Sequence, residues 1–383
     1  MSIYLDYNAS APISSEVLEC MIDVYRNCTG NADSRTHSYG ENARDLVETA
    51  RGQAASLFGV KKDEIFFTSG ATESNNLAIL GLQKYGLEVG RKHLIVTAIE
   101  HKAVLEAAKH LETEGFEIEL VNPGQDGCVS ADDILSRVRK DTRLVSVMHV
   151  NNETGVIQPV DQIGEALAKT DVLFHIDATQ SAGKLVSEIQ RLSYRMMSFS
   201  GHKMHGPQGV GGLILRKKQY RLPPVRPIMF GGAQEHGIRP GTLPTALIAG
   251  LGKACELAEQ NYTDHQQQNA AIKSRLLKLL AESNVAYSIN GNPDHCVSST
   301  LNVSFLGVSS EALMLATRQY CGIANGSACT SSTYQHSHVL LAMGLPDERI
   351  ESAARISWDA DADAEEILRG FSQMLNTVLN FTA

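Results

Sequence analysis

The segment Glu64-Ile65-Phe66-Phe67-Thr68-Ser69-Gly70-Ala71-Thr72-Glu73-Ser74 joins an apolar run to a turn of small residues. Its first half predicts a strand over residues 64–68, and the pattern after the turn predicts a helix over residues 72–82. The start of such a helix presents backbone N–H groups and the positive end of the helix dipole, which suit an anion such as phosphate. An ordinary helix cap explains the turn equally well, so its meaning depends on the residues at the ends of the other strands.

The same alternation of strand and helix continues along the chain. We predict strands over residues 93–98, 144–150 and 172–176, and helices over residues 102–114 and 160–169. The strands are continuous apolar runs, which is typical of parallel strands covered on both faces. The pattern therefore predicts an α/β fold in which right-handed crossovers connect the strands of the sheet.

A different pattern begins after about Gly250. The elements expected there are a largely helical stretch at 251–280, strands at 300–305 and 354–357, and helices near Glu311 and Ala364. We therefore expect a large domain over residues 14–255 and a smaller α+β domain formed by residues 1–13 and 256–383.

Composition excludes several classes of protein. Of the 383 residues, 43% are hydrophobic and 20% charged, which supports a core and excludes wholesale disorder. A net charge of −9 and an aromatic content of 6% disfavour direct nucleic-acid binding. No apolar run approaches the ~20 residues of a membrane span, and the N-terminal sequence has neither a signal nor a transit pattern. We expect a cytoplasmic protein that does not enter a membrane.

The cysteines offer a candidate thiol rather than a disulfide framework. There are seven, and no two have the C-x-x-C spacing, which argues against a disulfide scaffold and a zinc ribbon. We expect no metal site. Since most free cysteines pack as small hydrophobes, the thiol to examine is the one in unusual surroundings.

Polar groups come after the predicted strands in an ordered series. Glu100-His101, Asn151-Asn152-Glu153, Asp177-Ala178-Thr179-Gln180 and Ser200-Gly201-His202-Lys203 each come directly after an apolar run. In open α/β sheets the ligand lies beyond the carboxyl ends of the strands.

These groups together suit pyridoxal phosphate. Lys203 can form a Schiff base with an aldehyde, Asp177 can keep a pyridine nitrogen protonated, and His101 can stack on the ring and move protons. Taken singly, each residue has an ordinary interpretation, as a solvated charge, a helix cap or a surface histidine. Their occurrence in order at successive strand ends favours the cofactor.

On these residues the sequence resembles the cysteine desulfurases of the NifS/IscS type. They form a branch of the class V aminotransferase-like, fold-type I pyridoxal-phosphate enzymes. The resemblance runs from Tyr4-Leu5-Asp6-Tyr7 to about residue 370. The further motifs that carry it are Thr68-Ser69-Gly70-Ala71-Thr72-Glu73-Ser74-Asn75-Asn76, Glu100-His101-Lys102, His149-Val150-Asn151-Asn152-Glu153, Asp177-Ala178-Thr179-Gln180-Ser181, Ser198-Phe199-Ser200-Gly201-His202-Lys203, Arg239-Pro240-Gly241-Thr242 and Gly326-Ser327-Ala328-Cys329-Thr330-Ser331.

The resemblance implies a fold and a set of cofactor contacts. The fold is a large domain with a mixed, mainly parallel seven-stranded sheet flanked by helices, plus a smaller α+β domain. Lys203 matches the Schiff-base lysine, Asp177 the partner of the ring nitrogen, Gln180 the partner of the phenolic oxygen and His101 the stacking acid/base histidine. The residues that match the phosphate-binding groups are Ala71, Thr72, Ser200 and His202.

The resemblance also implies a substrate site, a nucleophile and a dimer. Asn152 matches a group at the cofactor that also positions the substrate, and Arg355 matches the clamp on the substrate carboxylate. Cys329, in a loop at about 322–335 of the small domain, matches the thiol that receives sulfur. Thr242 matches a phosphate ligand supplied by the second subunit of a homodimer.

The implied activity is conversion of L-cysteine to L-alanine with transfer of sulfur to Cys329 and then to an acceptor protein. The acceptor would serve iron–sulfur cluster assembly, tRNA thiolation or DNA phosphorothioation. Alternatives are a selenocysteine lyase or another enzyme of the class V aminotransferase-like type, such as a transaminase, and a non-catalytic sulfur-delivery scaffold. One stretch differs from the family: members commonly have a Leu-Gly-Arg-Phe-like sequence after Arg355, where this chain has the acidic Ile356-Ser357-Trp358-Asp359-Ala360-Asp361.

Overall fold

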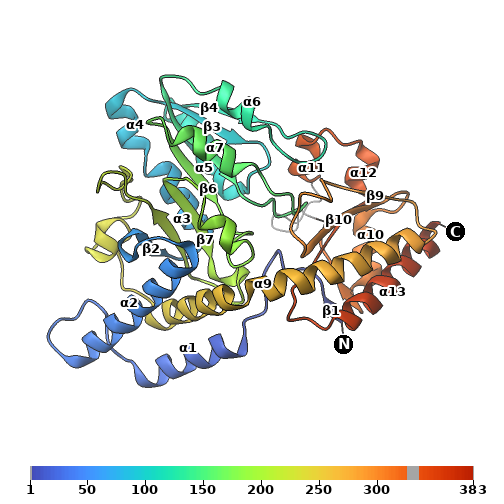
Figure 1. Cartoon of the computed structure of the whole chain (residues 1–383), viewed down its shortest axis with the longest axis horizontal. Helices are drawn as coiled ribbons and strands as arrows, with labels where there is room; N and C mark the ends of the chain where they lie inside the picture. The colour runs from blue at the N-terminus through green and yellow to red at the C-terminus, as the bar shows by residue number, and fades with distance from the viewer. Residues whose placement is uncertain (1, 326–335, 383) are drawn as a thin grey trace.

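A seven-stranded sheet forms the centre of the larger part of the molecule, which we call the large lobe (Figure 1). The computed structural model describes residues 2–325 and 336–382. The strand order is β2-β8-β7-β6-β5-β3-β4, and only β8 runs antiparallel to its neighbours. The strands are β2 Ile65–Thr68, β3 His93–Thr97, β4 Glu117–Val121, β5 Thr142–Met148, β6 Leu173–Asp177, β7 Met196–Ser200 and β8 Gly211–Leu215. This is the mixed, mainly parallel sheet that the family resemblance implied.

Helices cover both faces of this sheet, because its central strands are apolar on both sides. Alternate residues of one strand enter different cores. Val145 and Ile176 pack with residues of α2, α7 and α9, whereas Leu144 and Leu173 pack with residues of α3 and α5. The helical elements of the large lobe are α1 Ser15–Asn27, α2 Ser38–Phe58, η1 Lys62–Glu64, α3 Ala71–Leu80, α4 Gln83–Val89, α5 Lys102–Thr113, α6 Ala131–Ser136, α7 Val160–Leu167, α8 Val186–Ile189, η2 Gly201–Lys203 and η3 Gln234–Gly237.

A three-stranded antiparallel sheet, in the order β12-β10-β9, forms the centre of the small lobe. The chain start joins this lobe, since β1 pairs in parallel with β11. Helix α9 is unbroken and runs from one lobe to the other (Figure 1). The elements are β1 Ile3–Tyr4, α9 Thr245–Glu282, β9 Tyr287–Ile289, β10 Thr300–Phe305, α10 Ser310–Thr317, β11 Cys321–Gly322, α11 His338–Ala342, α12 Asp347–Glu351, β12 Ala353–Ser357 and α13 Ala364–Thr382. The expected boundary between the two domains, after residue 255, lies inside α9. The division of the chain into these two domains is therefore kept as a proposal.

Several predicted boundaries differ from the structure by a few residues, and for two of them the local sequence gives the reason. The helix expected from residue 251 begins at Thr245, directly after Pro244, whose fixed φ suits a helix start. The strand expected to reach residue 150 ends at Met148, because Asn151 accepts hydrogen bonds from the backbone N–H groups of residues 153 and 154 and so forms a turn.

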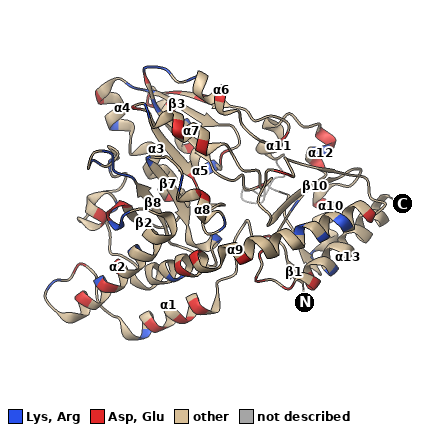
Figure 2. Cartoon of the chain, in the orientation of Figure 1, with Lys and Arg blue, Asp and Glu red and all other residues tan. Residues whose placement is uncertain are grey.

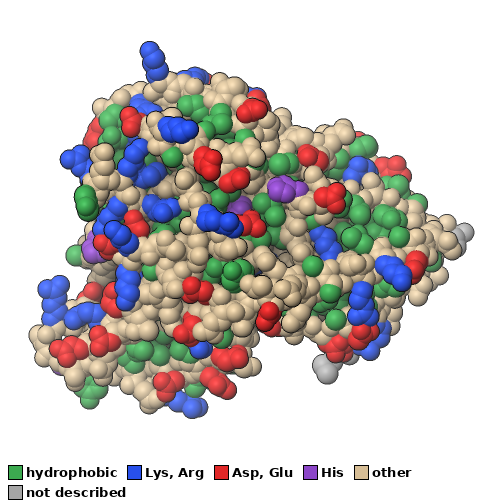
Figure 3. Space-filling model, in the orientation of Figure 1, with side chains coloured by type: hydrophobic (Ala, Val, Ile, Leu, Met, Phe, Trp, Pro, Cys, Tyr) green, Lys and Arg blue, Asp and Glu red, His purple; other side chains and the backbone are tan. Residues whose placement is uncertain are grey.

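Charged side chains are interspersed over the molecule (Figures 2 and 3). The basic run that begins at Arg216 lies at the end of β8. Lys217 forms an ion pair with Asp63, and the guanidinium of Arg216 lies 4.9 Å from the ring centroid of Tyr194. Lys217 and Arg216 are thus engaged within the fold. No helix within the described ranges is long and apolar enough to cross a membrane.

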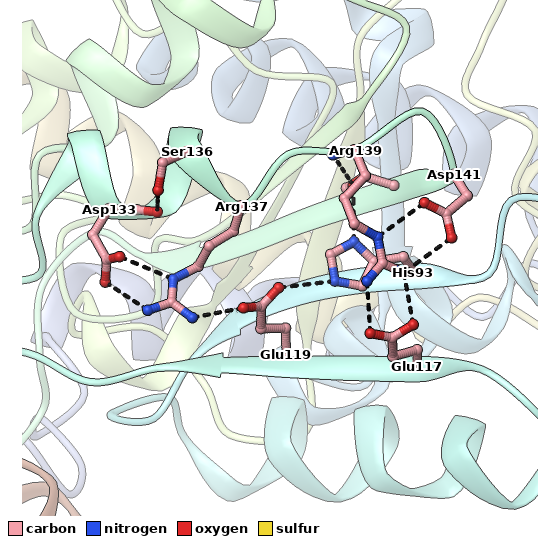
Figure 4. Close-up of polar contacts among 9 residues, drawn as sticks. His93, Glu117, Glu119, Asp133, Ser136, Arg137, Arg139 and Asp141 are labelled. Atoms are coloured by element: carbon pink, nitrogen blue, oxygen red, sulfur yellow. Dashed lines mark hydrogen bonds and ion pairs between the residues drawn. The ribbon is translucent and has the colours of Figure 1, made fainter.

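The edge strand β4 carries charges instead of a continuous apolar run, and it was not predicted. Glu119 pairs with Arg137 at 2.6 Å, and Glu117 pairs with Arg139 (Figure 4). The ring of His93, on the neighbouring strand, also contacts Glu119 at 3.2 Å. Charges on an edge strand oppose pairing with another sheet, and their alternation with apolar residues hides the strand from a search for apolar runs.

Candidate active site

The carboxyl ends of the parallel strands meet at one edge of the large sheet, beside a pocket of about 630 Å³. The small lobe contributes Arg355 of β12 to its wall. Ten of the twelve site residues predicted from the sequence line this pocket: Ala71, Thr72, His101, Asn152, Asp177, Gln180, Ser200, His202, Lys203 and Arg355. The fold therefore brings together side chains from five separate strand ends.

Lys203 is held at the end of β7 by a short helical turn, η2. Its Nζ donates to the backbone carbonyl of Asn8 and, at 2.7 Å, to that of Ala9. Both carbonyls belong to the segment that joins β1 to α1. The amine is thus directed by backbone acceptors, and Lys203 lines the pocket.

Asp177 is the last residue of β6 and is buried. Its Oδ2 accepts from Asn75 Nδ2 at 2.8 Å, and its Oδ1 accepts from the backbone N–H of Thr179 at 2.9 Å. A carboxylate has about four acceptor positions, so each oxygen keeps the capacity for a further donor. Asn75 and Thr179 fix the plane of the carboxylate.

The turn between β2 and α3 meets the turn between β7 and η2. Gly70 has a φ of 148°, and a Cβ built on it would lie 3.6 Å from Ser200 Oγ. A Cβ on Gly211 of the adjacent strand β8 would lie only 2.8 Å from Gly70 Cα, so glycine is required for this close approach.

Both turns can bind an anion. Helix α3 begins at Ala71 without a side-chain cap, so its first N–H groups are presented to a ligand. His202, which contacts Ser10 Oγ at 3.3 Å, completes this side of the pocket. Burial, reinforced by the charge of Lys203, lowers the pKa of His202 to about 4, so the ring is neutral at pH 7 and donates from one nitrogen.

His101 caps α5 and lines the pocket at the same time. Its Nδ1 accepts from the backbone N–H of Ala103 at 3.1 Å, which assigns the proton of the neutral ring to Nε2. Burial lowers the pKa of His101, and the charge of Lys203 adds to this, against an opposing effect of Asp177. His101 thus combines a local structural role with a position at the pocket wall.

Arg355 is buried and already has partners on both terminal nitrogens. Nη2 lies 2.6 Å from Asp6 Oδ1, and Nη1 donates to the carbonyl of Asn152 at 3.0 Å. Nε has no partner among the residues that the structure describes. Nη1 and Nη2 each carry a second N–H besides the one so engaged, and these are the donors that a carboxylate bound here would use.

Several pocket residues were not singled out from the sequence. Asn75 and Glu153 stand inside the quoted motifs, but nothing in those motifs shows what they contact. The backbone carbonyls of Asn8 and Ala9 leave no sequence signal, because any residue supplies a carbonyl. His338 lies far along the chain, at the start of α11.

His338 and Glu153 connect the pocket to α11. The carbonyl of Glu100 accepts from His338 Nε2 at 2.9 Å, and since a carbonyl only accepts, Nδ1 is the acceptor nitrogen of the neutral ring. Glu153 accepts from the hydroxyl of Ser337, which caps α11. Burial raises the pKa of the Glu153 carboxyl.

Two predicted site residues are not among the described residues that line the pocket. Thr242 is exposed and does not line the pocket of the single chain. Cys329 lies outside the described residues. Among the cysteines that the structure describes, Cys321 is buried in β11, and burial raises the pKa of its thiol to about 12. Because the thiolate is the nucleophilic form, Cys321 is a poor nucleophile near neutral pH.

The pocket fits pyridoxal phosphate. An amine, a buried carboxylate with acceptor capacity and an uncapped helix N-terminus surround one cavity. The buried hydroxyl of Thr179 lines this cavity and has no hydrogen-bond partner within the described part of the chain. Lys203 would hold the aldehyde carbon, Asp177 the ring nitrogen, and the turns at Ala71 and Ser200 the phosphate.

Comparison with known proteins agrees with this site. The aminotransferase class-V family model matches residues 3–369. Cysteine desulfurase IscS of Actinobacillus succinogenes is 42% identical over 371 residues, which cover 96% of this chain and 90% of the relative. A solved NifS-like protein superposes with a TM-score of 0.90 at 34% identity, covering 99% of this chain and 100% of that one. DndA from Streptomyces lividans has a TM-score of 0.80 at 42% identity, with coverage of 93% and 99%. The chain therefore belongs to the aminotransferase class-V family and, within it, to the cysteine desulfurases.

Proposed function

We propose that the pocket binds pyridoxal 5′-phosphate and L-cysteine, and that the protein converts L-cysteine to L-alanine while sulfur passes to Cys329 and then to an acceptor protein. We further propose that it acts as a cytoplasmic homodimer. The observation that carries the proposal is the placement of ten predicted site residues around one cavity that contains Lys203 and Asp177. It is tested by incubating the purified protein with L-cysteine and measuring alanine and protein-bound persulfide. If neither forms, the proposal fails.

The chain's own residues hold the reactants in place. Pyridoxal phosphate held here would supply an electron sink for the Cα of the amino acid, which activates the bond between Cβ and sulfur. Asp177 holds the ring nitrogen with a carboxylate that Asn75 and Thr179 keep in one orientation. Arg355 and Asn152 orient the substrate carboxylate, for which a guanidinium is well suited.

Proton transfers are divided between two imidazoles. In the neutral state His101 carries its proton on Nε2 and donates from that atom, because Nδ1 accepts from the backbone. His338 has the opposite arrangement, with Nε2 engaged by a carbonyl and Nδ1 able to accept a proton. We assign donation to His101 and proton acceptance to His338, both of which line the pocket.

The sulfur acceptor is a protein of iron–sulfur cluster assembly, tRNA thiolation or DNA phosphorothioation. Similarity to IscS and to DndA is equal in identity, at 42%, so both kinds of pathway supply candidates. The test loads the enzyme with ³⁵S from labelled cysteine and offers the candidate acceptors together. The protein that takes the label fastest identifies the pathway.

Replacing Asp177 with asparagine is expected to slow alanine formation by roughly 10²-fold or more while the fold is kept. An amide has the same shape and can still accept from Asn75, but it cannot balance the charge of a protonated ring nitrogen. The rate of alanine formation and the far-ultraviolet circular dichroism are measured together. A variant with wild-type turnover would show that Asp177 is not the partner of that nitrogen.

A second copy of the chain is expected to complete the site. Arg239 pairs with Glu73 of α3 at 2.8 Å and so holds the segment 239–242 at the pocket rim, while Thr242 stays exposed. Phe230, in the stretch that precedes this segment, is 90% exposed. Such exposure of a large aromatic residue is typical of an interface.

Mixing equal amounts of Lys203→Ala and Thr242→Ala chains is therefore expected to restore up to about a quarter of the sites, because random exchange makes about half of the dimers mixed and each mixed dimer has one intact site. Each variant alone serves as the control. Exchange is confirmed by mass spectrometry of tagged chains, and a confirmed mixed dimer without recovered activity would contradict a shared site.

A further inference from the structure

The acidic stretch after β12 folds back onto the large lobe. Asp359 is buried, and its Oδ2 lies 3.1 Å from His205 Nε2. Its Oδ1 lies 3.5 Å from His265 Nδ1 and accepts from Asn269 Nδ2 at 3.2 Å. Asp361 Oδ1 lies 3.5 Å from His265 Nε2. We call these five residues the Asp359 cluster; all of them except Asn269 line a second pocket of about 380 Å³, whose wall also includes Lys203.

Both imidazoles of the cluster face acceptors on both ring nitrogens. His205 Nδ1 lies 3.0 Å from the carbonyl of Pro12, and its Nε2 faces the carboxylate of Asp359. A carbonyl and a carboxylate only accept, so this geometry is satisfied when both nitrogens carry a proton. His265 lies between the carboxylates of Asp359 and Asp361, with one ring nitrogen 3.5 Å from each. Every acceptor therefore faces an N–H donor only when both rings are protonated imidazolium ions.

The cluster acts on the segment that carries Lys203. His205 stands two residues after Lys203 and has a φ of 57°, a backbone conformation that costs energy for a residue with a side chain. Its carbonyl accepts from the backbone N–H of Ser14 at 3.0 Å, and its ring holds Pro12. The turn is thus held between the segment that joins the two lobes and the end of β12.

We propose that the Asp359 cluster is a pH-dependent latch between the two lobes, in which His205 and Asp359 are positioning residues for Lys203. It rests on the proposed role of Lys203 as the cofactor lysine. When His205 loses a proton, one of its nitrogens becomes an acceptor that faces another acceptor at about 3 Å. The ring must then release either Pro12 or Asp359, and the strained turn loses a contact that holds it.

Other titratable side chains also surround the cluster. Lys184 faces Asp359, and Asp264 faces His265. Tyr7 and Glu16 also line the second pocket. Burial disfavours the charged ring of His205, but the hydrogen bond and charge of Asp359 outweigh it and raise its pKa.

The pKa values of His265 and Asp359 shift in the directions that keep both groups charged. The hydrogen bond to Asp359 raises the pKa of His265. Burial opposes ionisation of Asp359, yet hydrogen bonds from the two rings hold its pKa well below the ordinary value.

The signs of these shifts define the pH range of the latch. The two histidines contribute fully below the ordinary histidine pKa of ~6.5, and their contribution is lost as pH rises through the raised values. Asp359 contributes above the ordinary aspartate value of ~3.9, and its contribution is lost only in stronger acid. The latch is therefore closed between about pH 4 and 6.5 and opens toward alkaline pH.

The first test measures the protonation of His205 directly. In the ¹³C-labelled full-length protein, the His205 signal is assigned by its absence from the spectrum of His205→Gln, and it is titrated in the wild type. We expect a midpoint above ~6.5, and in Asp359→Asn a midpoint lower by about 1–3 pH units. A wild-type midpoint at or below ~6.5 would overturn the proposal, whether or not the variants fold.

The second test measures hydrogen exchange in peptides that cover residues 199–207, corrected for the intrinsic pH dependence of exchange. Wild-type protection is expected to fall by roughly tenfold between pH 6 and 8.5, and Asp359→Asn should show low protection at both values. Asp363→Asn is the matched control, because Asp363 accepts only from the backbone at the start of α13 among its hydrogen bonds in the described chain. Equal exchange in Asp359→Asn and Asp363→Asn would refute the latch. Neither readout depends on turnover, so failure of the proposed function would not affect them.

Discussion

Replacing Lys203 with alanine is expected to abolish covalent attachment of the cofactor and to reduce alanine formation by at least ~10³-fold. Lys203 supplies the amine at the centre of the pocket, and no other group there can form the same link at the same place. The purified wild type should be yellow. After borohydride reduction and proteolysis, the label should be found on the peptide that contains Lys203 and should be absent from the variant.

Lys102→Ala is the matched control for this experiment, because Lys102 lines the same pocket and lies directly after His101. It should keep the label on Lys203. A label found on Lys102 or on Lys184 in the wild type would assign the cofactor to a different amine. Circular dichroism of Lys203→Ala checks that loss of its hydrogen bonds to the carbonyls of Asn8 and Ala9 leaves the fold intact.

Replacing Cys329 with serine is expected to leave cofactor binding unchanged and to reduce alanine formation and persulfide by at least ~10³-fold. A hydroxyl is ionised far less readily than a thiol and cannot hold sulfur as a persulfide. Visible absorbance with and without L-cysteine reports binding, and mass spectrometry of the intact chain reports the added sulfur atom. The expected pattern is a normal spectral response to cysteine without a mass increase of one sulfur.

Cys20→Ser provides the comparison for this variant, since Cys20 lies on α1, away from the pocket lining. It should retain wild-type alanine formation and persulfide. Persulfide at the wild-type level in Cys329→Ser would transfer the role to another thiol. Cys321 is then the first to test by substitution, although its burial and its pKa of about 12 argue against it.

Much of the fold could be predicted from residue patterns. The strand at 300–305 has the predicted bounds, and β2, β3 and β6 lie within one or two residues of their predicted positions. Buried parallel strands need continuous apolar runs, and such runs are visible without any knowledge of distant contacts. The edge strand β4 was missed because its alternating charges serve the sheet edge rather than the core.

The candidate site could be predicted as a set of residues but not as an arrangement. The strand ends pointed to Lys203 and Asp177, because these side chains come directly after apolar runs and the carboxyl ends of parallel strands meet at one edge. No local pattern reveals that Asn75 orients Asp177, since the two residues are 102 positions apart. The same holds for Arg355, whose guanidinium is held by Asp6 from the other end of the chain.

The sequence by itself determined the α/β class, the order of the elements and the chemistry of the groups at the strand ends, because these depend on local periodicity and residue type. Only the tertiary structure decided which atoms face one another. It assigned the proton of His101 to Nε2 through a backbone contact, and it placed Asp359 against His205, 154 positions away. Protonation states and ion pairs depend on the dielectric surroundings and partners of a group, and these exist only once the chain has folded.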